Sequence, residues 1–230
     1  MLKAFVFLLL AASFSGCTQP AVFPEPPTPL RYLALGDSYT IGESVATESR
    51  WPVQLTAALQ QQGLPLDSLH IIARTGWRTD ELLAAVGAQN LSPDWDLVSL
   101  LIGVNNFYQG RPMDVYEAEF RALLDTAVFL AGARPDRVLV VSIPDYAYTP
   151  FGAGLPDPLA VSNGIDSFNA VNRRVALEKN VTWMNITDLS RRGLAEPALV
   201  ALDGLHPSGL QYNLWVQERL APAAGLLLAP

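Results

Sequence analysis

Four short segments, far apart in the chain, carry residue types that together could perform nucleophilic catalysis. The segment Gly36-Asp37-Ser38 follows an apolar run, Gly76 follows a second run, and Asn105 follows a third. Asp203 and His206 form an Asp-x-x-His pair further on. Acyl transfer to a side chain needs a nucleophile, a base beside it and a group that orients the base. A serine, a histidine and an aspartate are the types that fill these three positions.

Each of these residues also has an ordinary structural interpretation. Gly-Asp-Ser is common turn chemistry, Gly76 could be a turn glycine, and Asn105 could turn the chain together with Asn106. His206 precedes Pro207 and could be a loop histidine. Asp203 could be an N-cap or an Asp-Gly turn residue, which leaves Asp188 as a second candidate to orient the histidine.

The elements that must position these segments alternate between strands and helices from Arg31 onward. The apolar runs predict strands, and the helical spacing of apolar residues predicts helices between them. The predicted strands cover 31–37, 68–73, 96–103, 137–145 and 181–188, and the predicted helices cover 51–63, 79–89, 114–132, 164–180 and 208–221.

Such alternation indicates right-handed parallel crossovers, with helices on both faces of one sheet. The continuous hydrophobicity of the strands also favours a parallel sheet that is buried on both sides. The fold class is therefore α/β, with three layers (α/β/α) and a five-stranded parallel sheet. Sites in such sheets form outside the carboxyl ends of the strands, where the four segments fall.

In this order and placement, the segments resemble the sequence blocks of the SGNH/GDSL hydrolase (esterase/lipase) family. Ser38 in "GDSY", Gly76, Asn105 in "GVNN", and Asp203 with His206 in "DGLHPS" match the four blocks. The resemblance covers about residues 31–220 and implies a flavodoxin-like sheet. The family's third block usually reads Gly-x-Asn-Asp, so Asn106 stands where the family has an Asp. The sequence does not determine whether Asn106 makes the supporting hydrogen bond of that Asp.

The resemblance implies a role for each matched residue. Ser38 would attack an ester carbonyl, His206 would take its proton, and Asp203 would orient the imidazole. The backbone N–H groups of Ser38 and Gly76, with the Asn105 amide, would form the oxyanion hole. The α/β-hydrolase fold is rejected, because its Gly-x-Ser-x-Gly elbow is absent and Thr40 stands where the second Gly would be.

These roles lead to the hypothesis of a serine esterase that hydrolyses carboxylic esters, either short-chain acyl esters or carbohydrate O-acetyl groups. Two alternatives stay open: an O-acyltransferase that uses the same serine, and a non-catalytic binding lipoprotein. Residues near the blocks could line the substrate pocket or simply be packing residues. The candidates are Trp77, Arg78, Phe107, Tyr108, Tyr146, Tyr148 and Phe151. The long segment 145–164 is expected to be a loop that builds this pocket.

Composition limits the other possibilities. The chain has 230 residues, 50% of them apolar, which suits one domain with a single core. A formal net charge of −7 and the absence of a basic run argue against a nucleic-acid partner. No spacing of His, Cys or carboxylates suggests a metal site, and no phosphate-binding loop occurs, so no cofactor is expected. The second histidine, His70, is expected to be a core or surface residue. The sequence does not determine the oligomeric state.

The N-terminus has the pattern of a targeting segment. Lys3, a short apolar run and small residues precede Cys17, the only cysteine. "SFSGC" resembles a bacterial lipobox, although Phe14 replaces the usual Leu and ordinary cleavage upstream stays possible. We therefore expect a signal peptide over 1–16, a Pro-rich tether over 17–30 behind an acylated Cys17, and the hydrolase domain over 31–230. The expected location is the bacterial cell envelope, with a lipid anchor in a membrane. Thr18 follows Cys17 in place of the Asp that is associated with retention in the inner membrane, so the outer membrane is favoured if the host has one.

Overall fold

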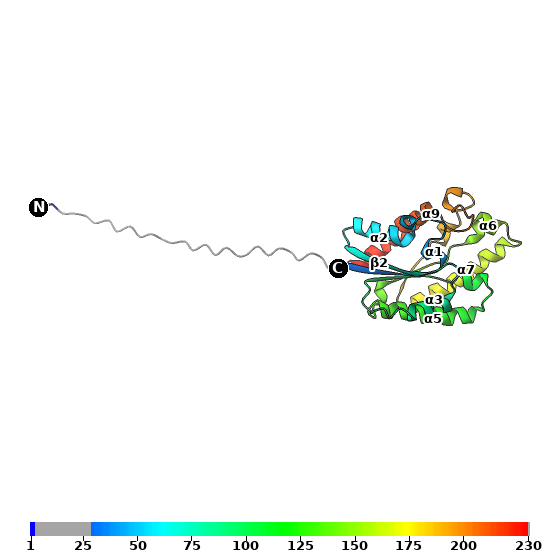
Figure 1. Ribbon diagram of the computed structural model, residues 1–230, viewed down its shortest axis with the longest axis horizontal. Helices are drawn as coiled ribbons and strands as arrows, with labels where there is room; N and C mark the ends of the chain where they lie inside the picture. The colour runs from blue at the N-terminus through cyan, green and yellow to red at the C-terminus, as the bar shows by residue number, and fades with distance from the viewer. Residues whose placement is uncertain (3–28, 230) are drawn as a thin grey trace.

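The computed structural model describes residues 1–2 and 29–229 (Figure 1). The predicted acylation site Cys17, most of the predicted signal peptide and most of the tether lie outside the described residues. Across the described part of the chain, no helix is both long enough and apolar enough to cross a membrane.

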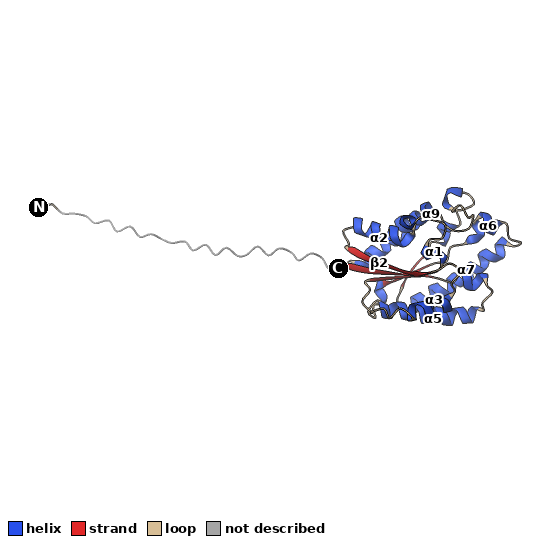
Figure 2. Cartoon of the chain, viewed as in Figure 1, coloured by secondary structure: helices blue, strands red, loops and turns tan. Residues whose placement is uncertain are grey.

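A single sheet of five parallel strands forms the middle layer, as the sequence predicted (Figure 2). The strand order is β2-β1-β3-β4-β5. The strands are β1 (Leu30–Gly36), β2 (Leu66–Ala73), β3 (Leu97–Leu101), β4 (Val138–Val141) and β5 (Thr182–Met184). Every residue of β3 and β4 is buried, because helices cover both faces of the sheet.

Helices lie on both faces of the sheet, with α2, α9 and α10 on one and α3, α5 and α7 on the other (Figure 1). The longer helices are α2 (Trp51–Gln61), α3 (Thr79–Gly87), α5 (Met113–Leu130), α7 (Pro158–Glu178), α9 (Gly209–Trp215) and α10 (Ala221–Leu228). Four short helices occupy loops: α1 (Ser38–Ile41), α4 (Val104–Tyr108), α6 (Pro150–Ala153) and α8 (Thr187–Ser190).

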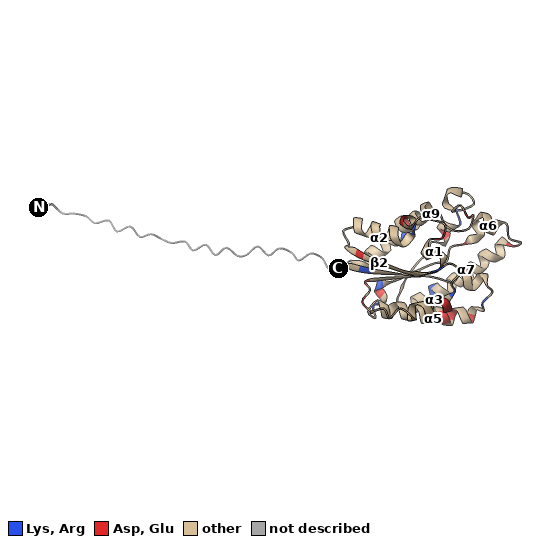
Figure 3. Cartoon of the chain, viewed as in Figure 1, with Lys and Arg blue, Asp and Glu red and all other residues tan. Residues whose placement is uncertain are grey.

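Charged residues of both signs lie along the helices, and several of them join neighbouring helices (Figure 3). Glu117 of α5 accepts hydrogen bonds from Arg121 at 2.8 Å and from Arg174 of α7 at 2.7 Å. These ion pairs are exposed to solvent, so each contributes little to stability. They hold α5 beside α7 in a defined register rather than supply the bulk of the stability.

The segment expected to be a long loop over 145–164 is shorter, because α7 begins at Pro158 rather than at residue 164. Asp157 caps this helix by accepting the N–H of Ala160 at 2.9 Å, and Pro158 occupies its first turn. The remainder contains a 3₁₀ turn, η3 (Tyr146–Tyr148), and α6. In the sequence, Asp157 and Pro158 fit a loop as well as a helix start, which is why the predicted loop is too long.

The two ends of the last predicted helix also differ from the structure. It begins at Gly209, continues through a π-helical segment over Val216–Leu220, and ends in α10. Ser208 caps its start by accepting the N–H of Gln211. This helix packs on α2, and so fixes the loop that precedes it against the first half of the domain.

The register of the sheet places the first and third strand ends side by side. Gly36 at the end of β1 lies opposite Leu101 at the end of β3 and opposite Ala73 at the end of β2. In the sheet, β1 lies between β2 and β3. The connection after β1 leads to β2 on one side and the connection after β2 leads to β3 on the other side, so the direction of strand addition reverses at β1. Loops that follow β1 and β3 can therefore splay apart and leave a crevice between them.

Candidate active site

Ser38 is the first residue of α1 and follows the end of β1 directly. Asp37 caps this short helix: its Oδ1 accepts the N–H of Tyr39 at 3.0 Å. Gly36 makes the sharp turn possible, since a Cβ there would lie 2.2 Å from Oγ1 of Thr40 and 2.5 Å from the carbonyl oxygen of Leu101. The glycine lets α1 pack directly on the strand end, and this packing presents Ser38 at the carboxyl edge of the sheet.

The carboxyl group of Asp37 is fully buried beneath this turn. Burial raises its pKa to about 7, and the hydrogen bond from Tyr39 offsets only part of that effect. Within the described residues its Oδ2 has no hydrogen-bond partner. A carboxyl group with a raised pKa carries less negative charge near neutral pH, so it opposes an anion forming beside Ser38 less than an ordinary aspartate would.

Asp203 and His206 are joined directly. Oδ2 of Asp203 lies 2.6 Å from Nδ1 of His206, and Oδ1 accepts the backbone N–H groups of Leu205 at 2.9 Å and His206 at 3.0 Å. The hydroxyl of Ser44 donates to the same Oδ2 at 2.6 Å. Partial burial acts to raise the pKa of Asp203, but these hydrogen bonds hold that pKa well below its ordinary value. The carboxylate therefore stays ionised and fixes the ring, with Nε2 free to face the cavity.

Asp188, the second candidate to orient the histidine, lies elsewhere. Its carboxylate accepts a hydrogen bond from Arg219 at 3.1 Å. His70 is also remote, since its Nε2 lies 2.9 Å from the side-chain oxygen of Gln89. The only carboxylate bonded to the His206 ring is that of Asp203, as far as the described residues extend.

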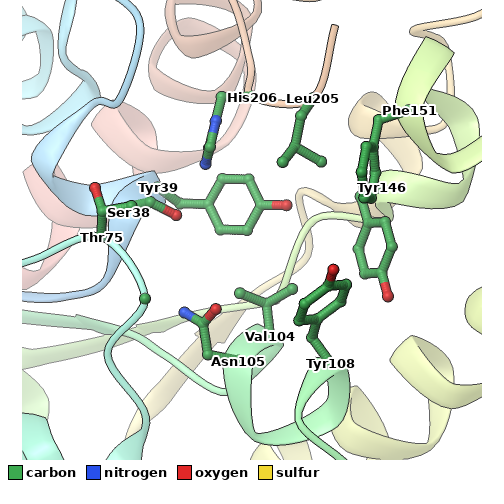
Figure 4. A pocket seen from close by; sticks show the side chains of 11 residues that line it. Ser38, Tyr39, Thr75, Val104, Asn105, Tyr108, Tyr146, Phe151, Leu205 and His206 are labelled. Atoms are coloured by element: carbon green, nitrogen blue, oxygen red, sulfur yellow. The ribbon is translucent and has the colours of Figure 1, made fainter. Parts of the chain in front are cut away.

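Ser38 and His206 line the same cavity (Figure 4). Ser38 is 5% exposed and His206 is 9% exposed, so both are shielded from bulk water except through this cavity. No direct hydrogen bond joins the Ser38 hydroxyl to the His206 ring within residues 29–229. In enzymes without substrate such contacts are often longer than hydrogen bonds and tighten when the substrate binds.

The three residues predicted to supply the oxyanion hole all line this cavity. The Nδ2 of Asn105, in α4, donates to the carbonyl of Trp77 at 3.0 Å, which orients the amide and leaves its second N–H free. The N–H groups of Ser38 and Gly76 have no hydrogen-bond acceptor in the described part of the chain. Gly76 has φ +87°, and a Cβ there would meet nothing within 4 Å. The backbone at Gly76 is thus open to a ligand on its cavity side.

Asn106, which replaces the family's usual Asp, is fully buried and makes the supporting bonds itself. Its Oδ1 accepts the N–H of Thr79 at 3.1 Å, and its Nδ2 donates to Oγ1 of Thr79 at 2.6 Å. The hydroxyl of Thr79 donates in turn to Glu119 of α5. With a carboxylate at 106, Thr79 would have two acceptors for one hydroxyl proton; the amide removes this conflict. The replacement therefore keeps α4 attached to the start of α3.

The cavity has a volume of about 270 Å³. Its lining is mainly apolar on the side of α4, η3 and α6, and polar at the Ser38 end (Figure 4). The lining residues are Ser38, Tyr39, Thr75, Gly76, Val104, Asn105, Tyr108, Tyr146, Phe151, Leu205 and His206. Thus Ser38, Gly76, Asn105 and His206 come together, as do three of the six predicted pocket aromatics: Tyr108, Tyr146 and Phe151.

Three of the predicted substrate-binding aromatics are not among the lining residues. Trp77 and Phe107 are partly buried and pack against the core, and the Phe107 ring contacts that of Phe168 in α7. Tyr148 is 37% exposed, because η3 turns Tyr146 inward and directs Tyr148 outward toward Arg191. Asp145 caps this turn, and Arg191 donates to its Oδ2 at 2.9 Å, which fixes the orientation of η3.

Sequence reasoning missed four lining residues: Tyr39, Thr75, Val104 and Leu205. Each is the chain neighbour of a motif residue, and this adjacency was the signal available in the sequence. In a loop that bends around a cavity, consecutive residues both reach its wall. Among the described residues, no group of three or more His, Cys, Asp or Glu side chains is arranged to hold a metal ion.

Comparison with known proteins adds a family assignment to this geometry. The model of the GDSL-like Lipase/Acylhydrolase family matches residues 34–214. No curated protein sequence matches the chain.

Solved structures with the same fold include TesA, with a TM-score of 0.63 at 20% identity, covering 86% of this chain and 99% of that one. Axe2, an acetylxylan esterase from Geobacillus stearothermophilus, has a TM-score of 0.60 at 19% identity, covering 87% and 94%. The psychrotrophic esterase EstA from Pseudoalteromonas has a TM-score of 0.59 at 17% identity, covering 82% and 92%. At these identities the likeness shows the fold.

Proposed function

This chain belongs to the GDSL-like lipase/acylhydrolase family, whose members hydrolyse carboxylic esters, and from that premise we propose that it is a serine esterase that works through an acyl-enzyme on Ser38. The observation that carries the proposal is the arrangement of Ser38, Gly76, Asn105 and His206 around one cavity, with Asp203 bonded to the histidine ring. These are the nucleophile, donors, base and orienting group that acyl transfer requires.

In the first half-reaction, the Ser38 oxygen attacks the ester carbonyl while Nε2 of His206 takes the hydroxyl proton. The carbonyl oxygen becomes an anion facing the N–H groups of Ser38 and Gly76 and the Asn105 amide. Collapse of this intermediate breaks the bond to the alcohol oxygen, and His206 returns the proton to the leaving alcohol. Water then repeats the sequence on the acyl-enzyme, and the carboxylic acid is released. The 2.6 Å contact between Asp203 and His206 supports the role of the carboxylate, which offsets the positive charge on the ring in both halves.

The cavity supports a small acyl group as substrate. A volume of about 270 Å³ is at the low end of ligand pockets, and its apolar wall suits the acyl part rather than a charged group. Two proteins of the same fold are named as esterases, one of them acting on acetyl xylan. We therefore propose acetyl or other short-chain esters, including O-acetylated carbohydrates, as the substrate class.

The test compares the wild type with Ser38→Ala on nitrophenyl esters of increasing acyl length. We expect kcat of the variant to fall by at least about 10⁴-fold, since triad members act as a unit. Wild-type kcat/KM should be highest for the shortest acyl chains. A fluorophosphonate probe should label the wild type and leave Ser38→Ala unlabelled. Equal turnover by the two proteins, with both folded by thermal unfolding, would refute the proposal. Product analysis with a sugar acceptor present distinguishes hydrolysis from O-acyl transfer.

We also propose that the protein is an envelope lipoprotein anchored through Cys17. The support is in the sequence: a short apolar run, small residues before a lone cysteine, and a Pro-rich segment after it. A semi-rigid segment of this composition would hold the domain away from the membrane surface.

A further inference from the structure

The turn that follows α1 is tied closely to Ser38. The N–H groups of Gly42 and Glu43 both donate to the carbonyl of Ser38, at 3.0 Å each. Ser44 comes next and has φ +64°, a left-handed conformation that serine rarely adopts. A residue held in such a conformation is over-determined by its surroundings and often has a functional role.

The partner of Ser44 lies 159 residues further along the chain. Its hydroxyl donates to Oδ2 of Asp203 at 2.6 Å. The same oxygen accepts Nδ1–H of His206 at 2.6 Å, while Oδ1 accepts two backbone N–H groups. No other side-chain hydroxyl bonds to this carboxylate within residues 29–229. The unusual backbone at Ser44 thus serves to aim one hydroxyl at the carboxylate that orients the base.

We propose that Ser44 is a positioning residue that holds the Asp203 carboxylate against the His206 ring and takes up part of its negative charge. The proposal rests on the proposed function of this site, because it assigns Ser44 a part in setting the basicity of His206. Through Ser44, the turn behind the nucleophile and the loop that carries the base are held together by one hydrogen bond.

The expected consequence has a definite sign. A hydroxyl that donates to Oδ2 shares the charge that would otherwise stabilise a protonated imidazole. Without the hydroxyl, Oδ1 of Asp203 still accepts the N–H groups of Leu205 and His206, so the carboxylate remains beside the ring. Its undivided charge then stabilises the positive ring more strongly, and the ring gains its proton at a higher pH. Because the reaction needs a neutral ring, the acidic limb of the pH profile of kcat/KM moves upward, by about half a pH unit. Looser positioning also lowers kcat/KM at pH 8 by about 3- to 10-fold.

Other titratable groups face this pair and do not change in the Ser44 variants. Tyr39 of α1 lies edge-on to the His206 ring with centroids 5.6 Å apart, and the buried Tyr212 of α9 is close enough to interact with the charge of Asp203. Groups from neighbouring segments are Asp37 beneath α1, Glu43 in the same turn, and Asp145 with Tyr146 after β4, with Arg191 bound to Asp145. Their contributions are common to all the proteins compared, so they cancel in the differences.

The experiment uses three variants of the full chain. Ser44→Gly removes the hydroxyl and at the same time relieves the left-handed backbone, so it should fold at least as well as the wild type. Ser44→Asn keeps a side chain that tolerates this backbone and can donate an N–H, so it should recover part of the effect. Ser92→Ala is the matched control, since the Ser92 hydroxyl donates to Asp94 at 2.8 Å on the surface, before β3 and away from the cavity.

Two readouts separate the outcomes. The chain has two histidines, so the ring protons of His206 can be followed by NMR titration once His70→Gln has assigned them. We expect Ser44→Gly to raise the midpoint of the His206 titration and the acidic limb together, with Ser44→Asn in between and Ser92→Ala unchanged. The proposal is overturned if the midpoint in Ser44→Gly equals that of the wild type or lies below it, whether or not any ester is hydrolysed. A shifted midpoint in a protein without Ser38-dependent hydrolysis would support the role of Ser44 and refute only the proposed function.

Discussion

Asp37 and Asp203 support the site from two different loops, and their surroundings move their pKa values in opposite directions. Asp37 is fully buried and accepts a hydrogen bond from Tyr39, and burial raises its pKa to about 7. Asp203 accepts four hydrogen bonds, which outweigh partial burial and lower its pKa. The difference comes from the number of donors that each carboxylate meets. It leaves one acid that is partly neutral at working pH and one that stays ionised to orient the base.

The raised pKa of Asp37 makes a prediction about stability. The folded carboxyl group binds its proton more tightly than the unfolded one, whose pKa is 3.8. Its stabilising contribution is therefore complete below about pH 3.8 and is lost as the pH rises to about 7. Asp37→Asn keeps an oxygen to accept the Tyr39 N–H but cannot ionise. We expect the Tm advantage of the variant over the wild type to grow by several degrees between pH 4 and pH 7, and to level off above.

Thermal unfolding of both proteins at four pH values between 4 and 8 measures this difference. A difference in Tm that does not change with pH would show that the folded and unfolded states bind the same number of protons at Asp37, and therefore that folding does not raise the pKa of this carboxyl group. Burying the new amide group could change Tm, but this change would be the same at every pH. It would therefore not produce a Tm difference that grows between pH 4 and pH 7.

Asn105 makes a prediction about rate. Its side chain lines the cavity, and one amide N–H is not bonded to Trp77 and could donate to a tetrahedral oxygen, which carries negative charge only in the transition state and the intermediate. Asn105→Ala should therefore lower kcat by about 10²- to 10³-fold and change KM little. Steady-state kinetics on a nitrophenyl acetate measures both constants. Asn213→Ala is the matched control, since that exposed amide donates to Gln54 at 2.9 Å and should retain kcat within about twofold. A loss seen only in KM would assign Asn105 to substrate binding instead.

At the scale of elements, α4 is the helix that presents Asn105, and two neighbours fix its position. Asn106 ties its first turn to the start of α3, and Phe107 packs on its far side against Gly164 of α7. A Cβ on Gly164 would lie 2.1 Å from Cε2 of Phe107, so no side chain fits there without moving α4 or the ring. The position of Asn105 thus depends on the missing Cβ of Gly164, although α7 contributes no catalytic residue.

Gly164→Ala tests this dependence. We expect the added methyl group to displace Phe107 and with it α4, which should lower kcat about tenfold and destabilise the fold by about 1–3 kcal/mol. Activity assays and thermal unfolding measure the two effects. Gly87→Ala in α3 is the control, because its Cβ would meet nothing within 4 Å, and alanine there should be neutral or slightly stabilising. Unchanged kcat in Gly164→Ala would mean that the Phe107 ring moves without α4.

At the scale of the whole molecule, the cavity and the entry of the N-terminal segment lie at opposite edges of the sheet. Strand β1 begins at Leu30 on the amino edge, whereas Ser38 follows the strand on the carboxyl edge. Figure 1 shows the same arrangement, with the start of β1 at one end of the domain and the loops around α6 and α9 at the other. A tether attached at Leu30 would leave the cavity facing away from its point of attachment.

The proposed anchor makes a prediction at this scale. In a bacterial host, the wild type should sediment with the membrane fraction, and Cys17→Ser should appear in the soluble fraction. Since the cavity lies far from Leu30, kcat of the detergent-solubilised wild type and of the variant should agree within about twofold. Fractionation with an esterase assay of each fraction measures both quantities. Wild-type protein found only in the soluble fraction would contradict the anchor and leave the esterase proposal intact.

The sequence by itself determined the α/β class, the five parallel strands and the placement of Ser38, Gly76, Asn105 and His206 after strand ends. These features follow from local patterns: apolar periodicity defines the strands and helices, and a parallel sheet must bring its carboxyl ends to one edge. The start of α7 does not follow from the sequence, because its capping residues Asp157 and Pro158 are equally common in loops.

The tertiary structure alone decided which side chains complete the site. The bond from Ser44 to Asp203 joins residues 159 positions apart, and the exchange at Asn106 is explained by Glu119 on another helix. Whether an aromatic residue turns into the cavity or into the core likewise depends on the twist of η3 and on the packing of α7 against α4. The local spacing of residues does not predict such contacts, because they depend on how whole helices and strands pack. That packing is determined only when the entire chain folds.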